Sequence, residues 1–486
     1  MTDPCGLDAV ALSGLLRSKR VSAREVIAAH IKRIEEVDPV INAVVTRTFD
    51  QALAKAAAAD DALANGADTG LLHGLPVAHK DLVQTAGVRT TFGSPAFADH
   101  VPDRDDLIVA RMAGAGGISL GKTNTPEFGA GSHTVNRIFG ATRNPYDPSR
   151  SAGGSSGGAA AALASRMVAL ADGSDLGGSL RNPASFCNVV GLRPSPGRVP
   201  AWPVSDVADW LSVEGPMART VADVALFLAV LSGPDPRVPL ALDAPPPALT
   251  DPGQVHDLLA RDARGVRVAW SPDLGGLPLD PAVRAALAPA RQVLADLGCE
   301  VADATPDLAG ADEGFRTWRA LKYATAFGPL VAARPGDLGP NVVWNVQRGL
   351  ELEAADLSRA TQLLAALAER ISAFFETVDV LACPVSQVPP FDVDLDWVHE
   401  IDGVPQLSYL DWMRSAYLIS ATGLPAVSVP AGFTHDGLPV GLQLVGRRRG
   451  DWDLLSIAYA FESATGYGAT SPPVVSNTVI SGPGGS

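Results

Sequence analysis

The sequence predicts a single large α/β domain whose central sheet is mixed but mostly parallel, twisted and covered by helices on both faces. Two observations lead to this prediction. From Gly74 onward, short apolar runs bounded by glycine and proline alternate with helix-like stretches, a pattern typical of a covered parallel sheet. No internal repeat or clear linker divides the 486 residues, of which 47% are hydrophobic.

The expected elements follow in chain order. Helical periodicity predicts helices at 7–37 (two, the second opening at Ser22), 50–65, 106–114, 159–166, 219–232 and 281–297. Short apolar runs predict strands within 74–83, 116–124, 167–180, 266–270 and 299–306, and two closing strands at 423–433 and 438–446. The proline-rich and acidic stretch 233–262 is expected to be a surface loop.

These elements define the expected domain organisation. One domain spans 1–470, with its core at about 70–235 and a variable substrate-pocket region at about 310–415. The variable region has less regular patterning and holds four of the eight tryptophans. Residues 471–486 are expected to form a disordered tail.

Composition excludes several classes of function. The formal net charge of −15, from 53 acidic and 38 basic residues, argues against a nucleic-acid or anionic-membrane surface. No apolar run is long enough to span a membrane, and the N-terminus lacks a secretory signal, so a cytoplasmic location is expected. The four cysteines and eight histidines show no ligand spacing, so neither a metal nor another cofactor is expected.

Two short motifs match well-known patterns in the wrong context. Gly116–Thr123 matches a phosphate-binding loop, but the predicted strand falls inside the motif and no helix follows Lys122. Gly153–Gly157 matches a nucleophile elbow, but a proline-containing segment rather than a strand leads into Ser155. A Ser-His-Asp esterase of the α/β-hydrolase type stays open as an alternative, with only His256, His399 and His435 downstream.

A lysine and two serines suggest another chemistry. Lys80 lies in the apolar segment LPVAHKDLV, where desolvation favours the neutral amine that a general base requires; a Lys80–Asp81 ion pair or a solvent-reaching side chain is the structural alternative. Ser155 and Ser179 are flanked by glycines, 24 residues apart, with a helix and a returning strand between them. Together these residues supply a base, a relay, a nucleophile and glycine amides for an oxyanion.

At this point the motifs resemble those of the amidase signature family. The main match is the block GGSSGG…DLGGSLRNPASFCNVVGLRPSPGRV, and GLPVAHKDLV, LGKTNTPEFGAGS, RNPYDPSRSAGGSSGG, EGPMARTVADVALFLAVL and TGLPAVSVPAGF…LPVGLQLVG follow the family's order. The resemblance covers roughly residues 10–465. It implies a serine hydrolase that cleaves carboxamide C–N bonds through an acyl-enzyme, without a cofactor.

The resemblance also implies roles for particular residues. Lys80 would be the base, Ser155 the relay in a cis peptide bond with Gly154, and Ser179 the nucleophile. The oxyanion would be held by N–H groups around Leu176, Gly177, Gly178 and Ser179, with Asp175 and Arg181 ordering the turn. Ser174 and Leu176 depart mildly from the family, many members of which carry threonine, or threonine and isoleucine, there.

The substrate is less defined by the sequence. A stand-alone amidase for aryl or alkyl amides, acting as a monomer or homodimer, is the first interpretation, and carbamates fit the same chemistry. The candidate substrate-binding residues are Gly131, Ser132, Arg198 and Trp202, the last two in a loop at 195–203 that could act as a lid or pocket wall; Arg198 is expected either to contact substrate or, in preference, to brace this loop. An aromatic pocket is expected from Trp318, Trp344, Trp397, Trp412, Trp202 and Trp210, although about half of these are expected in the core.

Two other interpretations remain. The chain could be the glutamine-hydrolysing member of a glutamyl-tRNA amidotransferase complex, its A-type subunit, although Met413 stands near the position where that protein carries a glutamine-binding acidic residue, with Asp411 close by. It could also be a scaffold that acts only in a complex. The presence of all three catalytic residue types argues against the scaffold.

Overall fold

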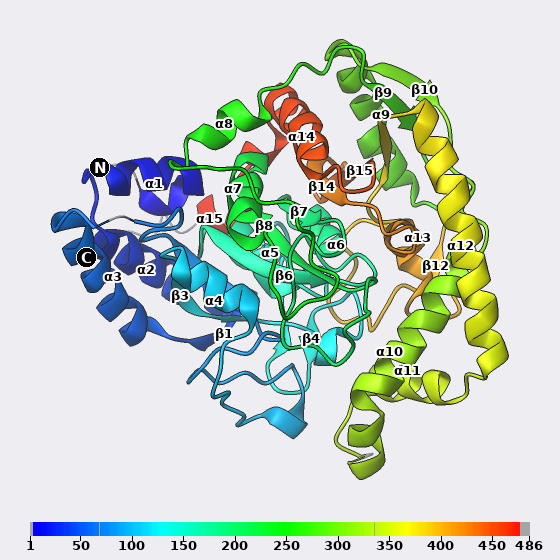
Figure 1. Ribbon diagram of the computed structural model, residues 1–486, viewed down its shortest axis with the longest axis horizontal. Helices are drawn as coiled ribbons and strands as arrows, with labels where there is room; N and C mark the ends of the chain where they lie inside the picture. Colours follow the sequence, from blue (N-terminus) through cyan, green and yellow to red (C-terminus); the bar gives the residue numbers. More distant parts are fainter. Residues whose placement is uncertain (1–2, 68, 335, 477–486) are drawn as a thin grey trace, which may run out of the picture.

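The computed structural model describes residues 3–67, 69–334 and 336–476. Its centre is a sheet of 11 strands (Figure 1). From one edge to the other the strands are β1 (Val44–Arg47), β3 (Ile118–Thr123), β2 (Pro76–Lys80), β6 (Leu170–Asp175), β8 (Val213–Ala218), β7 (Val190–Arg193), β14 (Ala426–Phe433), β15 (Pro439–Gly446), β11 (Val380–Pro384), β9 (Arg267–Trp270) and β10 (Glu300–Asp303).

The mixed α/β architecture is confirmed, but the expectation of a mostly parallel sheet is wrong. Parallel pairs occur in two flanking groups, β3-β2-β6 and β11-β9-β10. The strands between these groups, from β6 through β8, β7, β14 and β15 to β11, are all antiparallel. Strand period alone does not reveal direction, and the short 434–438 connection makes β14 and β15 a hairpin.

Helices cover both faces of this sheet. Helix α5 (Gly157–Ala164) packs on β6 and β8, and α7 (Val221–Leu231) packs on β8. On β15, a side chain at Gly441 would meet Ser185 of α6 (Arg181–Phe186), whereas one at Gly446 would meet Leu454 of α14 (Asp451–Thr465). Because positions an odd number of residues apart on a strand point to opposite faces, α6 and α14 lie on opposite sides of the sheet.

Other helices lie around the sheet. At one end are the N-terminal helices α1 (Ala9–Arg17), α2 (Ala23–Ile41) and α3 (Phe49–Ala64), at the left of Figure 1. The others are α4 (Leu107–Gly114), α8 (Gln254–Leu259), α9 (Pro281–Asp296) and α13 (Arg414–Ser420). Short strand pairs β4 (Val135–Asn136) with β5 (Gly140–Ala141), and β12 (Glu400–Ile401) with β13 (Val404–Pro405), form two small hairpins.

The region 310–415 is more regular than expected. Its first part forms three helices, α10 (Ala311–Ala333), α11 (Pro340–Leu350) and α12 (Ala354–Thr377), which pack on one another at the right of Figure 1. Gly314, Gly328 and Pro329 lie inside α10 and look like helix-breaking residues in the sequence. The long helix forms nevertheless, because its neighbours α11 and α12 supply the packing.

Two smaller expectations are corrected. The stretch 233–262 is mostly loop but ends in α8. The tail expected at 471–486 begins with described residues: Pro473–Ser476 form α15 and Val475 is buried, so disorder does not hold there. Residues 477–486 lie outside the described part of the chain. No helix among the described residues has the length and apolar character needed to cross a bilayer.

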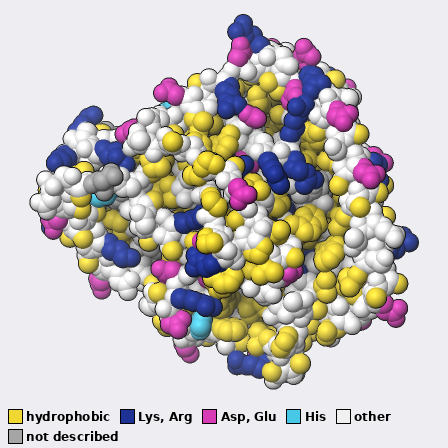
Figure 2. Space-filling view, viewed as in Figure 1, with side chains coloured by type: hydrophobic (Ala, Val, Ile, Leu, Met, Phe, Trp, Pro, Cys, Tyr) yellow, Lys and Arg dark blue, Asp and Glu magenta, His cyan; other side chains and the backbone are white. Residues whose placement is uncertain are grey.

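Hydrophobic side chains occupy much of the centre of the face shown in Figure 2, whereas acidic side chains lie mostly around its edge. The antiparallel strands β14 and β15 are part of the interior, where Leu442, Leu444 and Val427 are completely buried. Helix α6, which follows the turn that contains Ser179, packs on these strands.

Leu444 in β15 offers a test of this core. We expect Leu444→Ala to lower the free energy of unfolding by about 2–5 kcal/mol, because it leaves a cavity that the strands cannot close. Leu407→Ala is the matched control, since Leu407 is 89% exposed, and it is expected to change stability by less than about 0.5 kcal/mol. Urea unfolding measures both, and equal effects would contradict the assignment of β15 to the core.

Candidate active site

The three residues singled out in the sequence come together at the carboxyl ends of two neighbouring strands in the sheet. Lys80 ends β2, and Ser179 lies in the turn that links the neighbouring parallel strand β6 to α6. Ser155 lies just before α5, and the Ser156 N–H donates to the Ser179 carbonyl over 3.2 Å. Because the carboxyl ends of parallel strands lie side by side, these residues from distant segments share one site.

Lys80 is completely surrounded by protein and contacts hydroxyl groups. Its Nζ lies 2.7 Å from Ser155 Oγ, 2.9 Å from Ser156 Oγ and 3.1 Å from Ser174 Oγ. The alternative of a Lys80–Asp81 ion pair is wrong, because the Asp81 carboxylate accepts hydrogen bonds from Thr91 instead. A neutral amine fits three such contacts by donating two hydrogen bonds and accepting one.

Burial sets the charge of this amine. It lowers the pKa of Lys80 to about 7, although the carboxylates of Asp172, Asp175 and Glu214 oppose the shift. Burial, with the charges of Asp106 and Asp172, also raises the pKa of Glu214 to about 8. Near neutral pH the amine is therefore uncharged in a large fraction of the molecules, and the Glu214 carboxyl is mostly protonated.

Asp172 fixes the end of β2. Its carboxylate accepts from the Lys80 N–H over 2.7 Å and contacts His79 Nδ1 at 2.6 Å. Asp172 itself is buried in β6, so these bonds join the two parallel strands at the position of the lysine. Asp172, Glu214 and Ser156 were not identified from the sequence, because the pairing of β2, β6 and β8 brings the two carboxyl groups near Lys80 and the turn before α5 brings Ser156 there.

The peptide bond between Gly154 and Ser155 is cis, as the resemblance implied. Ser132 Oγ donates to the Gly154 carbonyl over 2.7 Å and accepts from Asn182 Nδ2 over 3.0 Å. Ser132, a candidate substrate-binding residue, is thus buried, and its hydrogen bonds hold the Gly154–Ser155 peptide in place. It does not line the cavity that contains Ser155 and Ser179.

The turn before Ser179 is organised by Asp175. Arg181 donates to both Asp175 oxygens, at 3.0 and 2.9 Å, and Arg193 lies at 3.2 Å from one of them. Burial alone would raise the pKa of Asp175, but the two guanidinium groups hold it well below its usual range. The carboxylate also accepts from the Gly178 N–H over 2.9 Å.

This last bond corrects the expected oxyanion site. The Gly178 N–H is already occupied, so it does not point into the cavity as an available donor. The N–H groups of Leu176, Gly177 and Ser179 have no acceptor within the described residues. The free donors are therefore those of Leu176, Gly177 and Ser179, all in one turn.

Ser155 and Ser179 line one cavity of about 860 Å³, which we call the serine cavity. Ser179 is only partly buried, and its hydroxyl has no hydrogen-bond partner in the part of the chain that the structure describes. Aromatic and apolar side chains form much of the lining, namely Phe92, Phe97, Phe128, Tyr323, Phe327, Leu330 and Met413. An aromatic pocket is present, but phenylalanines make it, and the six tryptophans named above do not line it.

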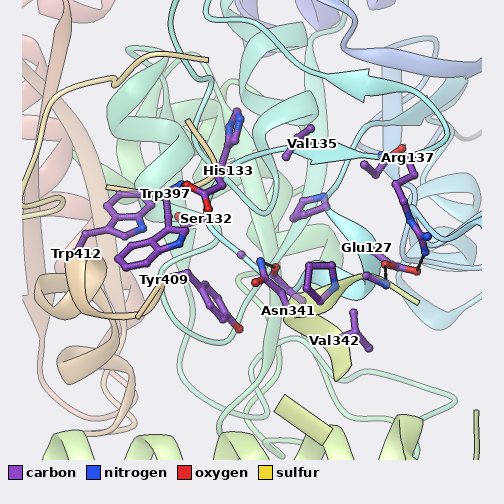
Figure 3. A pocket seen from close by; sticks show the side chains of 17 residues that line it. Glu127, Ser132, His133, Val135, Arg137, Asn341, Val342, Trp397, Tyr409 and Trp412 are labelled. Atoms are coloured by element: carbon purple, nitrogen blue, oxygen red, sulfur yellow. Dashed lines mark hydrogen bonds and ion pairs between the residues drawn. The ribbon is translucent and has the colours of Figure 1, made fainter. Parts of the chain in front are cut away.

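Two of those tryptophans line a second cavity of about 310 Å³, shown in Figure 3. Trp397 and Trp412 lie with Tyr409 at one end, and Glu127 and Arg137 lie toward the other. Ser132 faces this second cavity, and Gly131 lines both cavities. Of the candidate substrate-binding residues, Gly131 alone borders the serine cavity.

The serine cavity is lined by the end of the loop 195–203 and by the residues after it, and not by the two loop residues proposed to bind substrate. Arg198 is buried and bonded to Asp451 at 3.2 Å, so it braces the loop. Trp202 contacts Arg237 through its ring, outside the serine cavity. Of the predicted loop 195–203 only Pro203 lines the cavity, together with residues that follow the loop, namely Val204, Ser205, Asp206, Asp209 and Ser212.

The two short motifs are explained by the fold. Lys122 is buried within β3, where its amine donates to the Val83 carbonyl and to Thr85 Oγ1, so the phosphate-loop geometry does not form. His256, His399 and His435 are exposed and lie outside the serine cavity. Among the described residues, no group of three or more His, Cys, Asp or Glu is arranged to hold a metal ion.

Comparisons with known proteins identify the family of the chain. The family model "Amidase" matches residues 25–455. A glutamyl-tRNA(Gln) amidotransferase subunit of Thermosynechococcus vestitus is 36% identical over 479 residues, covering 93% of this chain and 96% of that protein. An acylamidase of Rhodococcus erythropolis is 34% identical over 464 residues, covering 94% and 95% of the two chains.

A solved structure extends the likeness to the fold. The crystal structure of a bacterial aryl acylamidase of the amidase signature enzymes superposes with a TM-score of 0.88 at 30% identity, covering 94% of this chain and 96% of that one. The resemblance noted in the motifs is confirmed. The chain belongs to the amidase signature family of serine hydrolases.

Proposed function

We propose that this protein hydrolyses carboxamides, with Ser179 as nucleophile, Ser155 as proton relay and Lys80 as base. The observation that carries this proposal is the 2.7 Å contact between the buried amine of Lys80 and the Ser155 hydroxyl. A neutral amine in this position can accept the relay's proton, which an ammonium cannot do. Ser179 presents a partly exposed hydroxyl in the same cavity.

The proposed cycle uses only groups of this chain and water. Lys80 takes the Ser155 proton, Ser155 takes the Ser179 proton, and Ser179 Oγ attacks the substrate carbonyl carbon. The N–H groups of Leu176, Gly177 and Ser179 bind the oxyanion, and each such donor contributes about 3 kcal/mol. Ser155 and Lys80 return a proton to the nitrogen, the C–N bond breaks, and water cleaves the acyl-enzyme by the reverse transfers.

The lining of the serine cavity favours a substrate with an apolar or aryl group. Phe92 stacks on Phe128 with ring centroids 6.1 Å apart, and Phe128 lies 4.4 Å from Phe327. Rings arranged in this way offer flat apolar surfaces to an aromatic amide. Alkyl amides and carbamates present the same carbonyl to the same serine, and we include them in the proposed substrate range.

A second candidate function, glutamine hydrolysis within an amidotransferase, is favoured by the relatives that carry the amidotransferase name. The cavity argues against it. Met413 borders the cavity where a carboxylate would have to bind the glutamine ammonium group. Asp411 does not line the cavity, and its oxygens already accept hydrogen bonds from Arg316, Arg414 and Ser408.

The purified chain should therefore act alone on an anilide. We expect measurable hydrolysis of 4-nitroacetanilide and no ammonia release from glutamine above the level of a Ser179→Ala control. A coupled ammonia assay and nitroaniline absorbance measure the two reactions. Activity on glutamine alone, or no activity until a partner protein is added, would contradict the stand-alone amidase.

Covalent labelling separates the roles of the two serines. We expect Ser179→Ala to abolish both turnover and labelling by a phosphonate probe, because it removes the nucleophile. Ser155→Ala and Lys80→Ala should each reduce kcat by about 10²-fold or more, leaving any slow labelling on Ser179. Mass spectrometric mapping of the labelled peptide identifies the site, and a label on Ser155 would overturn the assignment.

The pH dependence of turnover tests the base. Because Lys80 must be neutral to accept a proton and its pKa is about 7, kcat/KM should rise through pH 7 and level off above it. Below pH 6 it should fall about tenfold per pH unit. An unperturbed lysine would instead give activity that keeps rising toward pH 10, and such a profile would exclude the buried neutral amine.

A further inference from the structure

Arg319 is a buried cation on the wall of the serine cavity. It belongs to α10, is 4% exposed and lines the same cavity as Ser155 and Ser179. Its Nη2 donates to the Tyr409 hydroxyl over 2.6 Å, but Nε has no acceptor among the described residues. No carboxylate among the described residues forms an ion pair with this guanidinium group.

Neighbouring cations are paired. Lys322, the lysine that lines the cavity, contacts Asp209. Arg316, one turn earlier on α10, is bonded to Asp312 and Asp411. Arg319 instead lies over the ring of Tyr323, 4.6 Å from its centroid.

The missing counter-ion has an energetic meaning. A buried charge costs several kcal/mol unless it is paired and its hydrogen bonds are satisfied. Stacking on aromatic rings returns about 2 kcal/mol when the cation is desolvated. A partly satisfied guanidinium on a cavity wall is therefore suited to a ligand that brings the anion.

The position of Arg319 along α10 relates it to the reacting group. Phe315, four residues earlier, packs beside Gly177 in the turn that carries Ser179. Residues four apart lie one above the other on a helix face, at a rise of about 6 Å. The residues of α10 that line the cavity become more exposed to solvent along the helix, from the buried Arg319 and Tyr323 to the exposed Ala333. Arg319 thus lies toward the inner, serine end of the cavity.

The acidic residues of the cavity leave this cation available. Asp209 is held by Lys322, and Asp206 is exposed on the loop, where it accepts from the Ala208 N–H. We propose that Arg319 binds a carboxylate of the substrate, so that the preferred substrates are amides that carry a carboxylate group as well as an apolar part. This inference rests on the proposed amide hydrolysis and specifies its substrate class.

Binding to a catalytically inert variant tests the proposal without turnover. In the Ser179→Ala protein we compare 4-phenylbutyrate with its neutral isostere 4-phenylbutanamide by calorimetry. The carboxylate is expected to bind about tenfold tighter or more, the range of a charge-assisted hydrogen bond. Equal affinities of the two ligands would overturn the proposal without any change at Arg319.

Variants of Arg319 then assign the effect. Adding Arg319→Met to Ser179→Ala should remove the preference for the carboxylate, and Arg319→Lys should retain part of it, because a point charge replaces a bidentate group. Lys322→Met is the matched control, since it removes a cavity cation that has its own carboxylate, and the preference should persist. A preference that survives Arg319→Met, or that disappears equally with Lys322→Met, would contradict the role of Arg319.

A purely structural role for Arg319 gives a different result. In that case Arg319→Met and Arg319→Lys would lower Tm and weaken both ligands equally, which overturns the proposal. Failure of the proposed function is seen separately, as absence of anilide hydrolysis by the unmodified protein. Anilide hydrolysis with no carboxylate preference would leave the amidase standing and remove only the inference about Arg319.

Discussion

The burial of one amine among hydroxyl groups is the constraint on which the site depends. Lys80 Nζ contacts Ser155, Ser156 and Ser174, and the charges near it lie beyond hydrogen-bond distance. Were a carboxylate in direct contact, the amine would stay protonated and could not act as a base. The pairing of β2 with β6, held by Asp172, places the lysine in this environment.

A second buried network shapes the turn that faces the substrate. Asp175 binds Arg181, Arg193 and the Gly178 N–H, and Arg181 also reaches Gln443 in β15. The turn is thereby attached to the antiparallel centre of the sheet. The free N–H groups of the turn are those that do not donate to this network. The Gly178 N–H donates to Asp175 and is therefore not among them.

Much of this site could be predicted from the sequence, and the limits have physical causes. Lys80, Ser155 and Ser179 carry local signals, namely an apolar segment and glycine-flanked turns. The cavity lining carries none, because Phe92, Phe128 and Phe327 come from segments far apart in the sequence that meet only in the folded chain. For the same reason the sequence left open whether Arg198 contacts substrate or braces the loop, and which tryptophans line the substrate pocket; tertiary contacts give Arg198 the bracing role and place Trp397 and Trp412 at a second cavity. Strand direction in the sheet centre was equally invisible to periodicity.

The protonation state of Lys80 is the central claim, and it can be measured directly. The chain has six lysines, so ¹³Cε-labelled lysine gives a spectrum simple enough to assign, with Lys80→Met and Lys122→Met identifying the two buried residues. We predict that the Lys80 signal titrates near pH 7 in the unliganded protein. A Lys80 signal that stays in the ammonium form up to pH 10 would contradict the neutral base on which the mechanism depends.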